Sequence, residues 1–577
     1  MTTDTVPQQE YKRTLKSYIP IADWLPKYQK TWLRGDVIAA LTLWALLVPE
    51  AMAYAGIAGM PPETGLYAAP LALIAYAIFG TSRQLDVGPS SAVAALSFSV
   101  VLGLGAVVGS EEWILLTIAL AFMVGFMLIL GGFLKLGILA DFLSRPVLDG
   151  FVVGVAISIA VGQLDKIMGF EPEGYDFIPE VLQYIRYLPE TDWPTFIVGM
   201  VSLFLLFAMH KFTPKLPAAL VVLFLAIIVS TIFNFESLGI HVVGEIPAGL
   251  PDFGIPEGLG LEELLAVVPG AVGVALVAFA ESVAIARAYA TKYRYEVDAN
   301  QELIAIGASN LGSGFSGAFA VDGSMSRTAA ADGAGGKSQM VSIIAAIAVL
   351  ITAVALTWLF YNLPEATLGA IVIHAVWKNI NFTKISQYRA ITRVDFVTAL
   401  VAMIGVLALG LLEGLVLAAF LGLIVLLLGT KQRSTSVLGK MPETAVYRSL
   451  ENYPDGESYP GLLILRFDGA LFFANSHDFI VAAQRAIDAT DPAPTVVLLD
   501  CESINDVDAT AVISLKEFED QLEGMDMQLR FAQVKTHVHD IMERGGLTEN
   551  IPAEHFYPSV QTAVDAYLAE NKEEDTN

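Results

Sequence analysis

Two short segments in otherwise apolar sequence have the residues of a helix start. They are Gly88-Pro-Ser-Ser and Gly323-Ser-Met-Ser. Gly-Pro interrupts a helix, and serine followed by small helix-forming residues is typical of a helix N-terminus. Because the first N–H groups of a helix have no partner within it and the helix dipole is positive there, such an end can bind an anion. The alternative is a kinked helix whose free N–H groups bond to a neighbour. The candidate ligand-contacting residues of the two segments are Gly88, Ser90, Ser91, Ser324 and Ser326.

A single arginine follows the second segment. Arg327 would lie about one turn inside the helix, where its planar guanidinium suits a tetrahedral or planar oxyanion. An arginine at membrane depth is costly and rarely structural. The alternative is an ion pair with a nearby carboxylate, for which the sequence offers Asp322, Asp332 and Glu281. The two interpretations are compatible if that carboxylate also exchanges a proton.

Two acidic residues lie within apolar runs. Glu281 is inside the run Ala271–Ala290, and Glu50 directly follows Pro49. A carboxylate at membrane depth is a candidate functional residue. A buried carboxylate near an arginine can take up and release a proton during a cycle, which makes Glu281 a candidate for proton exchange. For Glu50 the alternative is an ion pair at the wall of a water-filled cavity.

The composition places these residues in a membrane. Of 577 residues, 55% are hydrophobic and 16% are charged, against about 25% charged in soluble domains. Long apolar runs between Val37 and Thr430 leave room for about fourteen spans of roughly 20 residues, some of them short or broken. We expect a cytoplasmic N-terminal segment at residues 1–35 and a transmembrane transport domain at residues 36–432.

The distribution of charge predicts the orientation. Lys and Arg are enriched in cytoplasmic loops, and here they recur in alternate loops, whereas residues 163–193 and 231–264 are acidic. We therefore expect a multi-pass protein of the cell membrane with both termini in the cytoplasm. A net charge of −26 argues against a nucleic-acid partner, and the single Cys501 excludes a disulfide framework.

Two internal similarities suggest a repeat. Glu50-Ala-Met-Ala-Tyr-Ala resembles Glu281-Ser-Val-Ala-Ile-Ala, and Val87-Gly-Pro-Ser-Ser resembles Val321-Asp-Gly-Ser-Met-Ser, at offsets of 231 and 234 residues. Each copy would hold about seven spans, and an odd number inverts the second copy in the membrane. The two helix starts would then face each other across one anion site. Chance similarity between alanine-rich helices is the alternative.

The same residues resemble a known family. Val48-Pro-Glu-Ala-Met-Ala-Tyr-Ala, followed by Ala58-Gly-Met-Pro-Pro-Glu-Thr-Gly, resembles the signature of the sulfate permease (SulP) anion transporters. Gly88-Pro-Ser-Ser, Asn300-Gln-Glu-Leu and Gly323-Ser-Met-Ser-Arg-Thr resemble later spans of that family. The resemblance covers nearly the whole chain. It implies a polytopic α-helical fold of fourteen spans in a 7+7 inverted repeat, a core domain that moves against a gate domain, and a homodimer.

The resemblance also implies residue roles. By position, Tyr54, Ser91, Ser326 and Arg327 would contact the anion, and Glu281 would be the proton-coupling acid. Glu50 departs from the pattern, because the sulfate-transporting members usually have Gln there. A second acid beside an anion site would repel the substrate unless that acid is protonated or paired.

The composition after Lys431 is that of a soluble α/β domain. Strands are expected at residues 461–467, 495–500 and 528–532, and a helix at Ala509–Leu522. Their order resembles the cytoplasmic STAS domain, expected at residues 440–570. In the related antagonists of anti-sigma factors an Asp-Ser-Thr-Gly turn is phosphorylated on serine, but this chain has Asp508-Ala-Thr-Ala, which leaves Thr510 as a weak substitute. The domain would serve assembly or folding, or bind a nucleotide or protein.

The leading interpretation is a secondary active transporter that couples a small oxyanion, first of all sulfate, to protons by alternating access. The alternatives are a bicarbonate or dicarboxylate carrier, driven by sodium or not, and an uncoupled anion channel, which would need no titrating carboxylate. An enzyme is not expected, because the spans contain no Ser/His pair or Cys/His cluster. The expected partners are the anion, a proton, the lipid bilayer and a second copy of the chain, without a cofactor or metal.

Overall fold

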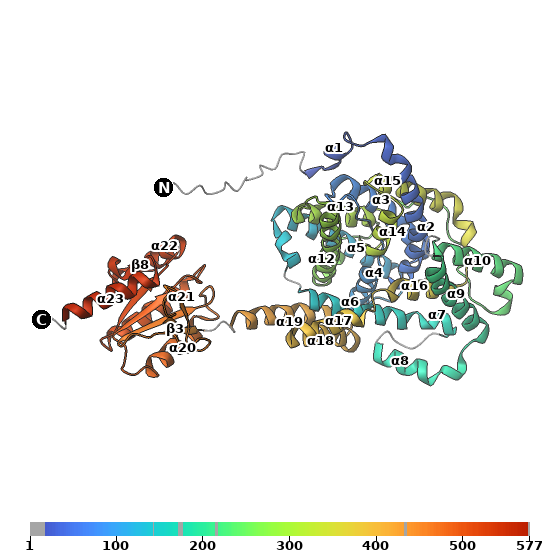
Figure 1. The fold of residues 1–577 in the computed structure, drawn as a ribbon. Helices are drawn as coiled ribbons and strands as arrows, with labels where there is room; N and C mark the ends of the chain where they lie inside the picture. Colours follow the sequence, from blue (N-terminus) through green and yellow to red (C-terminus); the bar gives the residue numbers. More distant parts are fainter. Residues whose placement is uncertain (1–17, 142–143, 171–176, 214–216, 432–434, 575–577) are drawn as a thin grey trace. The chain divides into compact units, whose positions relative to one another are not determined.

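The structure is a computed structural model that describes residues 18–141, 144–170, 177–213, 217–431 and 435–574. Residues 1–17 of the expected N-terminal segment and residues 171–176 of the acidic loop 163–193 lie outside the described residues. The chain forms two compact units, Met1–Gly422 and Leu423–Asn577, each of which is described by itself (Figure 1).

Fourteen of the described helices correspond in chain order to the predicted spans, seven in each half of the membrane region. The first seven are α2 (Leu33–Ile57), α3 (Pro62–Phe79), α4 (Ser91–Gly103), α5 (Glu111–Phe133), α6 (Arg145–Gly162), α9 (Trp193–Phe212) and α10 (Ala218–Phe233). The second seven are α12 (Val268–Tyr293), α13 (Ala299–Phe315), α14 (Met325–Gly333), α15 (Met340–Ile351), α16 (Glu365–Trp377), α18 (Arg393–Leu409) and α19 (Leu411–Lys431). Shorter helices connect them: α7 (Leu164–Met168), α8 (Phe177–Arg186), α11 (Leu261–Ala266) and α17 (Phe382–Ile391).

Only some of these helices are long enough to cross a membrane alone. Seven described helical segments have the length and apolar composition of a full span, and α4 and α10 are shorter apolar helices. The predicted number of fourteen therefore includes short and broken helices. The third helix of each half is the clearest example, because α4 has 13 residues and α14 has 9.

The spans pack as two groups, which match the expected core and gate. In the first group α13 packs against α5 and α3, and α15 packs against α3 and α2. In the second group α6 packs against α18, and α9 packs against α16. The first group thus takes the first four helices of each half, and it contains both short helices. In Figure 1, α3, α5, α13, α14 and α15 lie together, with α9 and α10 at one side.

The packing of α2 on α3 shows why the sequence places small residues here. Both helices are apolar on all sides, as expected for helices buried among others. A Cβ atom at Gly65 of α3 would collide with the carbonyl of Ala51 on α2. Glycine is therefore required at this crossing, and the close approach fixes α2, which carries Glu50, against the core group.

The second unit is an α/β domain with a six-stranded sheet in the order β4-β3-β5-β6-β7-β8. Strands β5 to β8 are parallel, and β3 is antiparallel to both of its neighbours. The strands are β3 (Thr435–Lys440), β4 (Tyr447–Ser449), β5 (Leu462–Phe467), β6 (Val496–Asp500), β7 (Gln528–Ala532) and β8 (Phe556–Tyr557). The predicted strands β5, β6 and β7 are confirmed, as is the predicted helix, α21 (Ala509–Glu523).

Helices cover both faces of this sheet. Alternate residues of a strand point to opposite faces, and accordingly Leu463 and Leu465 of β5 belong to one core cluster while Leu462 and Ile464 belong to the other. The first cluster includes α20 (Ser476–Asp488), α21 and α22 (Thr536–Arg544), and the second includes α23 (Val560–Glu574). The domain therefore has its own core on each face of the sheet.

Candidate functional site

Two short strands bring the two predicted helix starts together. β1 (Val87–Gly88) pairs antiparallel with β2 (Asp322–Gly323), so that Val87 lies opposite Gly323 and Gly88 lies opposite Asp322. Helix α4 begins shortly after β1, and α14 begins shortly after β2. The N-termini of two helices from opposite halves of the membrane region therefore lie side by side, as the internal repeat predicts.

Serine residues cap both helices. The Ser90 hydroxyl accepts the backbone N–H of Val93 at 3.5 Å, and the Ser324 hydroxyl accepts the backbone N–H of Arg327 at 3.4 Å. These caps use one N–H of each helix and leave the other first-turn donors for a ligand. Of the predicted contact residues, the buried ones are Gly88 and Ser90, the partly exposed ones are Ser91 and Ser324, and the exposed one is Ser326.

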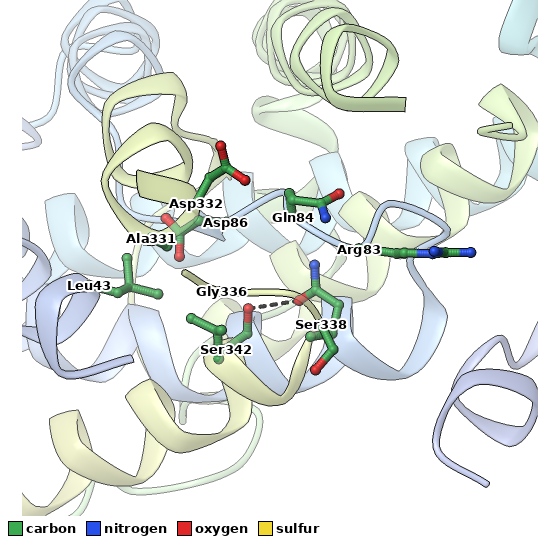
Figure 2. Close-up of a pocket in the computed structure, with 11 residues that line it drawn as sticks. Leu43, Arg83, Gln84, Asp86, Ala331, Asp332, Gly336, Ser338 and Ser342 are labelled. Carbon is green, nitrogen blue, oxygen red and sulfur yellow. Dashed lines mark hydrogen bonds between the residues drawn. The ribbon is translucent and has the colours of Figure 1, made fainter. Parts of the chain in front are cut away.

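A small cavity beside the strand pair is too small for an oxyanion. Its volume is about 10 Å³, and Asp86, Asp332, Gln339 and Ser342 are among the residues that line it (Figure 2). A cavity of this size has room for about one water molecule, which is less than an oxyanion needs. It adjoins the Asp86 carboxylate, whose Oδ1 has no hydrogen-bond partner among the described residues.

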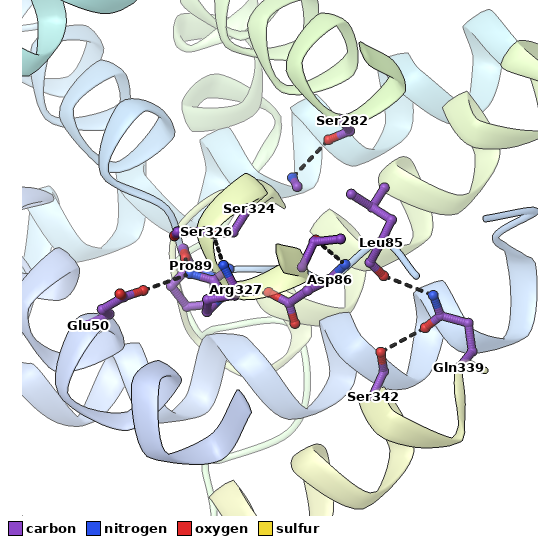
Figure 3. Close-up of polar contacts among 12 residues, drawn as sticks. Glu50, Leu85, Asp86, Pro89, Ser282, Ser324, Ser326, Arg327, Gln339 and Ser342 are labelled. Atoms are coloured by element: carbon purple, nitrogen blue, oxygen red, sulfur yellow. Dashed lines mark hydrogen bonds and ion pairs between the residues drawn. The ribbon is translucent and has the colours of Figure 1, made fainter. Parts of the chain in front are cut away.

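Arg327 lies at the start of α14 and is almost completely buried, with 1% of its surface exposed. Its Nε donates to Asp86 Oδ2 at 2.5 Å, and its Nη1 donates to the Pro89 carbonyl at 2.7 Å and to Glu50 Oε2 at 3.4 Å. Asp86 and Glu50 approach the guanidinium from opposite sides (Figure 3). Its Nη2 has no hydrogen-bond partner among the described residues. Arg327 therefore has one free amino group in a buried, polar site.

The carboxylates that pair with Arg327 are not those that the sequence suggested. Asp332 instead forms an ion pair with Lys292 at 2.6 Å and accepts a hydrogen bond from Tyr293. The principal partner, Asp86, was missed by sequence reasoning. The available signal was an acidic residue two positions before the Gly88-Pro89 break. The Asp86 backbone carbonyl also accepts the N–H of Ser324 at 2.9 Å, which joins the segments that precede α4 and α14.

Gly88 lies against the free amino group of Arg327. A Cβ atom at this position would be 3.4 Å from Arg327 Nη2, in van der Waals contact with it, and would occupy the space beside it. Glycine at position 88 therefore leaves no side chain beside this buried, unpartnered amino group.

Glu50 and Tyr54 lie one turn apart on the same face of α2, which packs against α14. Both are buried, with 7% and 5% of their surfaces exposed. The Tyr54 hydroxyl lies near the Glu50 carboxylate. The structure therefore brings Glu50 and Tyr54 close to Arg327.

Glu281 lies on α12 beside the other strand. The next residue, Ser282, accepts the backbone N–H of Gly323 at 2.8 Å, which ties α12 to β2. The carboxyl groups of Glu281 and Asp322 are neighbours, with the Ser90 hydroxyl close to Asp322. Asp322 is fully buried, and neither of its oxygens has a hydrogen bond of ordinary geometry from the described residues. Because adjacent carboxylates repel in a medium of low polarity, one proton shared by the pair would stabilise it.

The start of α21 in the second unit is capped by Asp508. Its carboxylate accepts the backbone N–H of Ala511 at 2.8 Å and that of Phe473 at 2.9 Å. Thr510 is exposed in the first turn of the helix. The residue that would be the weak substitute for a phosphorylated serine is thus accessible at a helix N-terminus.

Comparison with known proteins agrees with this arrangement. The sulfate permease family matches residues 33–402, and the STAS domain matches residues 453–563. A probable sulfate transporter of Mycobacterium tuberculosis is 36% identical over 95% of this chain and 98% of its own length. The chloroplastic sulfate transporter 4.1 of Arabidopsis thaliana is 31% identical over 96% of this chain and 83% of its own length.

Solved structures share the fold. The murine Solute Carrier 26 family member A9 anion transporter, in its inward-facing state, has a TM-score of 0.91 at 24% identity and covers 99% of this chain and 97% of its own. The transmembrane domain of a cyanobacterium bicarbonate transporter has a TM-score of 0.59 at 22% identity and covers 69% of this chain and 98% of its own. With its helical membrane region and C-terminal STAS domain, this multi-pass membrane protein belongs to the sulfate permease family of anion transporters.

Proposed function

We propose that this protein is a secondary active transporter that carries a small oxyanion, first of all sulfate, together with a proton by alternating access of the core and gate groups. The observation that carries the proposal is the β1–β2 pair, which holds the N-termini of α4 and α14 side by side next to Arg327. We expect the protein to act as a homodimer in the cell membrane with both termini in the cytoplasm.

The anion would bind where several weak donors converge. The first-turn N–H groups of α4 and α14 offer donors and the positive ends of two helix dipoles. The free Nη2 of Arg327 adds a charge-assisted donor, and the hydroxyls of Ser91, Ser326 and Tyr54 complete the contacts. A tetrahedral oxyanion can accept hydrogen bonds in several directions at once, which such a ring of donors suits.

The proton would be held by the Glu281–Asp322 pair. The two carboxyl groups adjoin each other, and Asp322 is buried without a hydrogen bond of ordinary geometry from the described residues. Since β2 carries Asp322 and also precedes α14, the protonation of the pair and the occupation of the anion site act on the same short strand. This shared element supports coupling between proton and anion.

Sulfate is the first candidate because the relatives at 36% and 31% identity are named as sulfate transporters. The runner-up is a bicarbonate or dicarboxylate carrier, with or without sodium. It is kept because a domain named as part of a bicarbonate transporter has the same fold.

The test is uptake of labelled sulfate into proteoliposomes with and without an inward proton gradient, in competition with bicarbonate, fumarate and chloride. We expect gradient-stimulated uptake by the natural protein and by Glu262→Gln, a matched control at an exposed acid of α11. Glu281→Gln should bind sulfate but lose the stimulation.

The other outcomes of this assay separate the alternatives. If sulfate is not taken up and another anion or a sodium gradient restores transport, the runner-up replaces sulfate symport. A conductance that Glu281→Gln leaves unchanged would instead indicate an uncoupled channel.

A further inference from the structure

The anion site holds more acid than its arginine can neutralise. Asp86 Oδ2 is 2.5 Å from Arg327 Nε, and both side chains are buried, with 2% and 1% exposed. A charge-assisted pair of this length and burial is a full ion pair. Glu50 Oε2 is a second acidic group, 3.4 Å from Nη1 of the same arginine. Asp86 alone therefore matches the charge of Arg327, and Glu50 is an additional carboxylate.

Glu50 occupies the edge of the guanidinium that an oxyanion would use. Arginine binds oxyanions through two parallel N–H donors of its planar fork. Nε is taken by Asp86, so the remaining edge is formed by Nη1 and Nη2. Nη2 is free among the described residues, while Nη1 is shared between the Pro89 carbonyl and Glu50. An oxyanion that reaches Nη2 would therefore lie next to the Glu50 carboxylate.

We propose that Glu50 is a built-in competitor of the substrate: its charged carboxylate excludes the anion from Arg327, and a proton on Glu50 admits it. This inference rests on the proposed function, because it takes Arg327 as the anion contact. It assigns a second proton to the transport cycle, bound in the same step as the anion and separate from the proton of the Glu281–Asp322 pair. Glutamate at position 50 is thus a determinant of anion binding.

The charges that face Glu50 are of both signs. Arg327 from α14 and Lys378 from the end of α16 are positive, and Asp86, before β1, is negative. Tyr54 on α2 adds a neutral hydroxyl next to the carboxylate. A carboxylate held between opposing charges can gain a proton without losing its place in the fold, because the Asp86–Arg327 ion pair remains.

Competition between Glu50 and the anion determines the direction in which the affinity for the anion changes with pH. If a proton must enter with the anion, raising the pH above the range in which Glu50 titrates weakens anion binding by about tenfold per pH unit. This effect concerns equilibrium binding and needs no membrane or gradient. It can therefore be measured separately from the proton coupling of transport.

The experiment is equilibrium binding of labelled sulfate to the purified full-length protein in detergent, from about pH 5 to about pH 8, the range in which buried carboxyl groups titrate. We expect the affinity of the natural protein, and of the control Glu262→Gln, to fall as the pH rises. Glu50→Gln should reduce this dependence by about one proton, that is, tenfold per pH unit. If Glu50→Gln elutes as a folded species and keeps the full pH dependence, or binds no sulfate at any pH, the competitor role is wrong.

A second variant, Glu50→Asp, tests the proposal even if Glu50→Gln does not fold. Glu50→Asp keeps a carboxylate but draws it back from Arg327 by one methylene group, so sulfate should bind more tightly than to the natural protein at the upper end of the pH range. Unchanged affinity there would contradict the proposal. Equal binding at every pH by the natural protein would overturn the competitor role and leave the transporter intact. No sulfate binding by any variant would overturn sulfate as the substrate and the inference with it.

Discussion

Replacing Arg327 should lower both the stability of the protein and its affinity for the anion, for different reasons. A second substitution, at Asp86, distinguishes these two effects. In Arg327→Met the apolar side chain keeps most of the packing, but the Asp86 carboxylate, 2% exposed, loses its counter-ion. Removing one partner of a buried ion pair costs about 3–5 kcal/mol. In Arg327→Met/Asp86→Asn both charges are gone, so most of this destabilisation should disappear. Sulfate binding should be lost in both proteins, because neither has the free amino group.

The measurement is the thermal midpoint in detergent, followed by size-exclusion chromatography, together with binding of labelled sulfate. Lys27→Met provides the control, because it breaks the Lys27–Asp23 pair, in which the two side chains are 71% and 70% exposed. Such exposed pairs contribute about 0–1 kcal/mol, so its midpoint should hardly change. If the double variant is no more stable than Arg327→Met, Asp86 is not the counter-ion that the geometry indicates. If either variant binds sulfate with the natural affinity, Arg327 is not the anion contact.

Three further changes test other parts of the structure. Gly88→Ala would place a Cβ atom 3.4 Å from Arg327 Nη2, in the space beside it. It should weaken sulfate binding about tenfold or more, which is the contribution of one charge-assisted hydrogen bond, without lowering the thermal midpoint. Unchanged affinity would mean that Nη2 does not contact the anion. Asp508→Ala removes the cap of α21 and should destabilise it by about 1 kcal/mol, seen as faster hydrogen exchange in its first turn, whereas Asp508→Asn should exchange like the natural protein. Burial raises the pKa of the Cys501 thiol, so at mildly alkaline pH a smaller fraction of the thiol is ionised than in an exposed cysteine. Cys501 should therefore react slowly with maleimide until the protein is denatured. Rapid labelling of the folded protein would show that the chain opens at the end of β6.

The starts of α4 and α14 could be predicted from the sequence because the signals for a helix start are local. A Gly-Pro break and a capping serine act within about four residues of a helix start, so Ser90 and Ser324 could be identified without knowing their neighbours. The partner of Arg327 could not be identified in this way. Asp86 is 241 positions away in the chain and meets the arginine only through the register of β1 and β2. Strands of two residues have no alternation of apolar and polar side chains that would specify a register.

The same contrast holds in the STAS domain. Strands β5 and β6 are covered on both faces, so their sequences are nearly continuous apolar runs that stand out in the chain. The edge strands β4 and β8 have only three and two residues and were not expected. Their short pairing depends on the neighbouring strand rather than on a pattern of their own.

The Asp86–Arg327 pair also constrains how strongly an anion can bind. A bare arginine in a buried site would attract an anion strongly and release it slowly, which suits a binding protein better than a carrier. Here the charge of Arg327 is already matched by Asp86 at 2.5 Å, so an anion bound in the proposed site would join a nearly neutral pair. In the proposed site its binding would then depend on one free amino group, a few hydroxyls and two helix ends, and each helix end contributes about 0.3–2 kcal/mol. Contributions of this size sum to a modest affinity, and a transporter that alternates between two sides of a membrane needs an anion that can leave as readily as it enters.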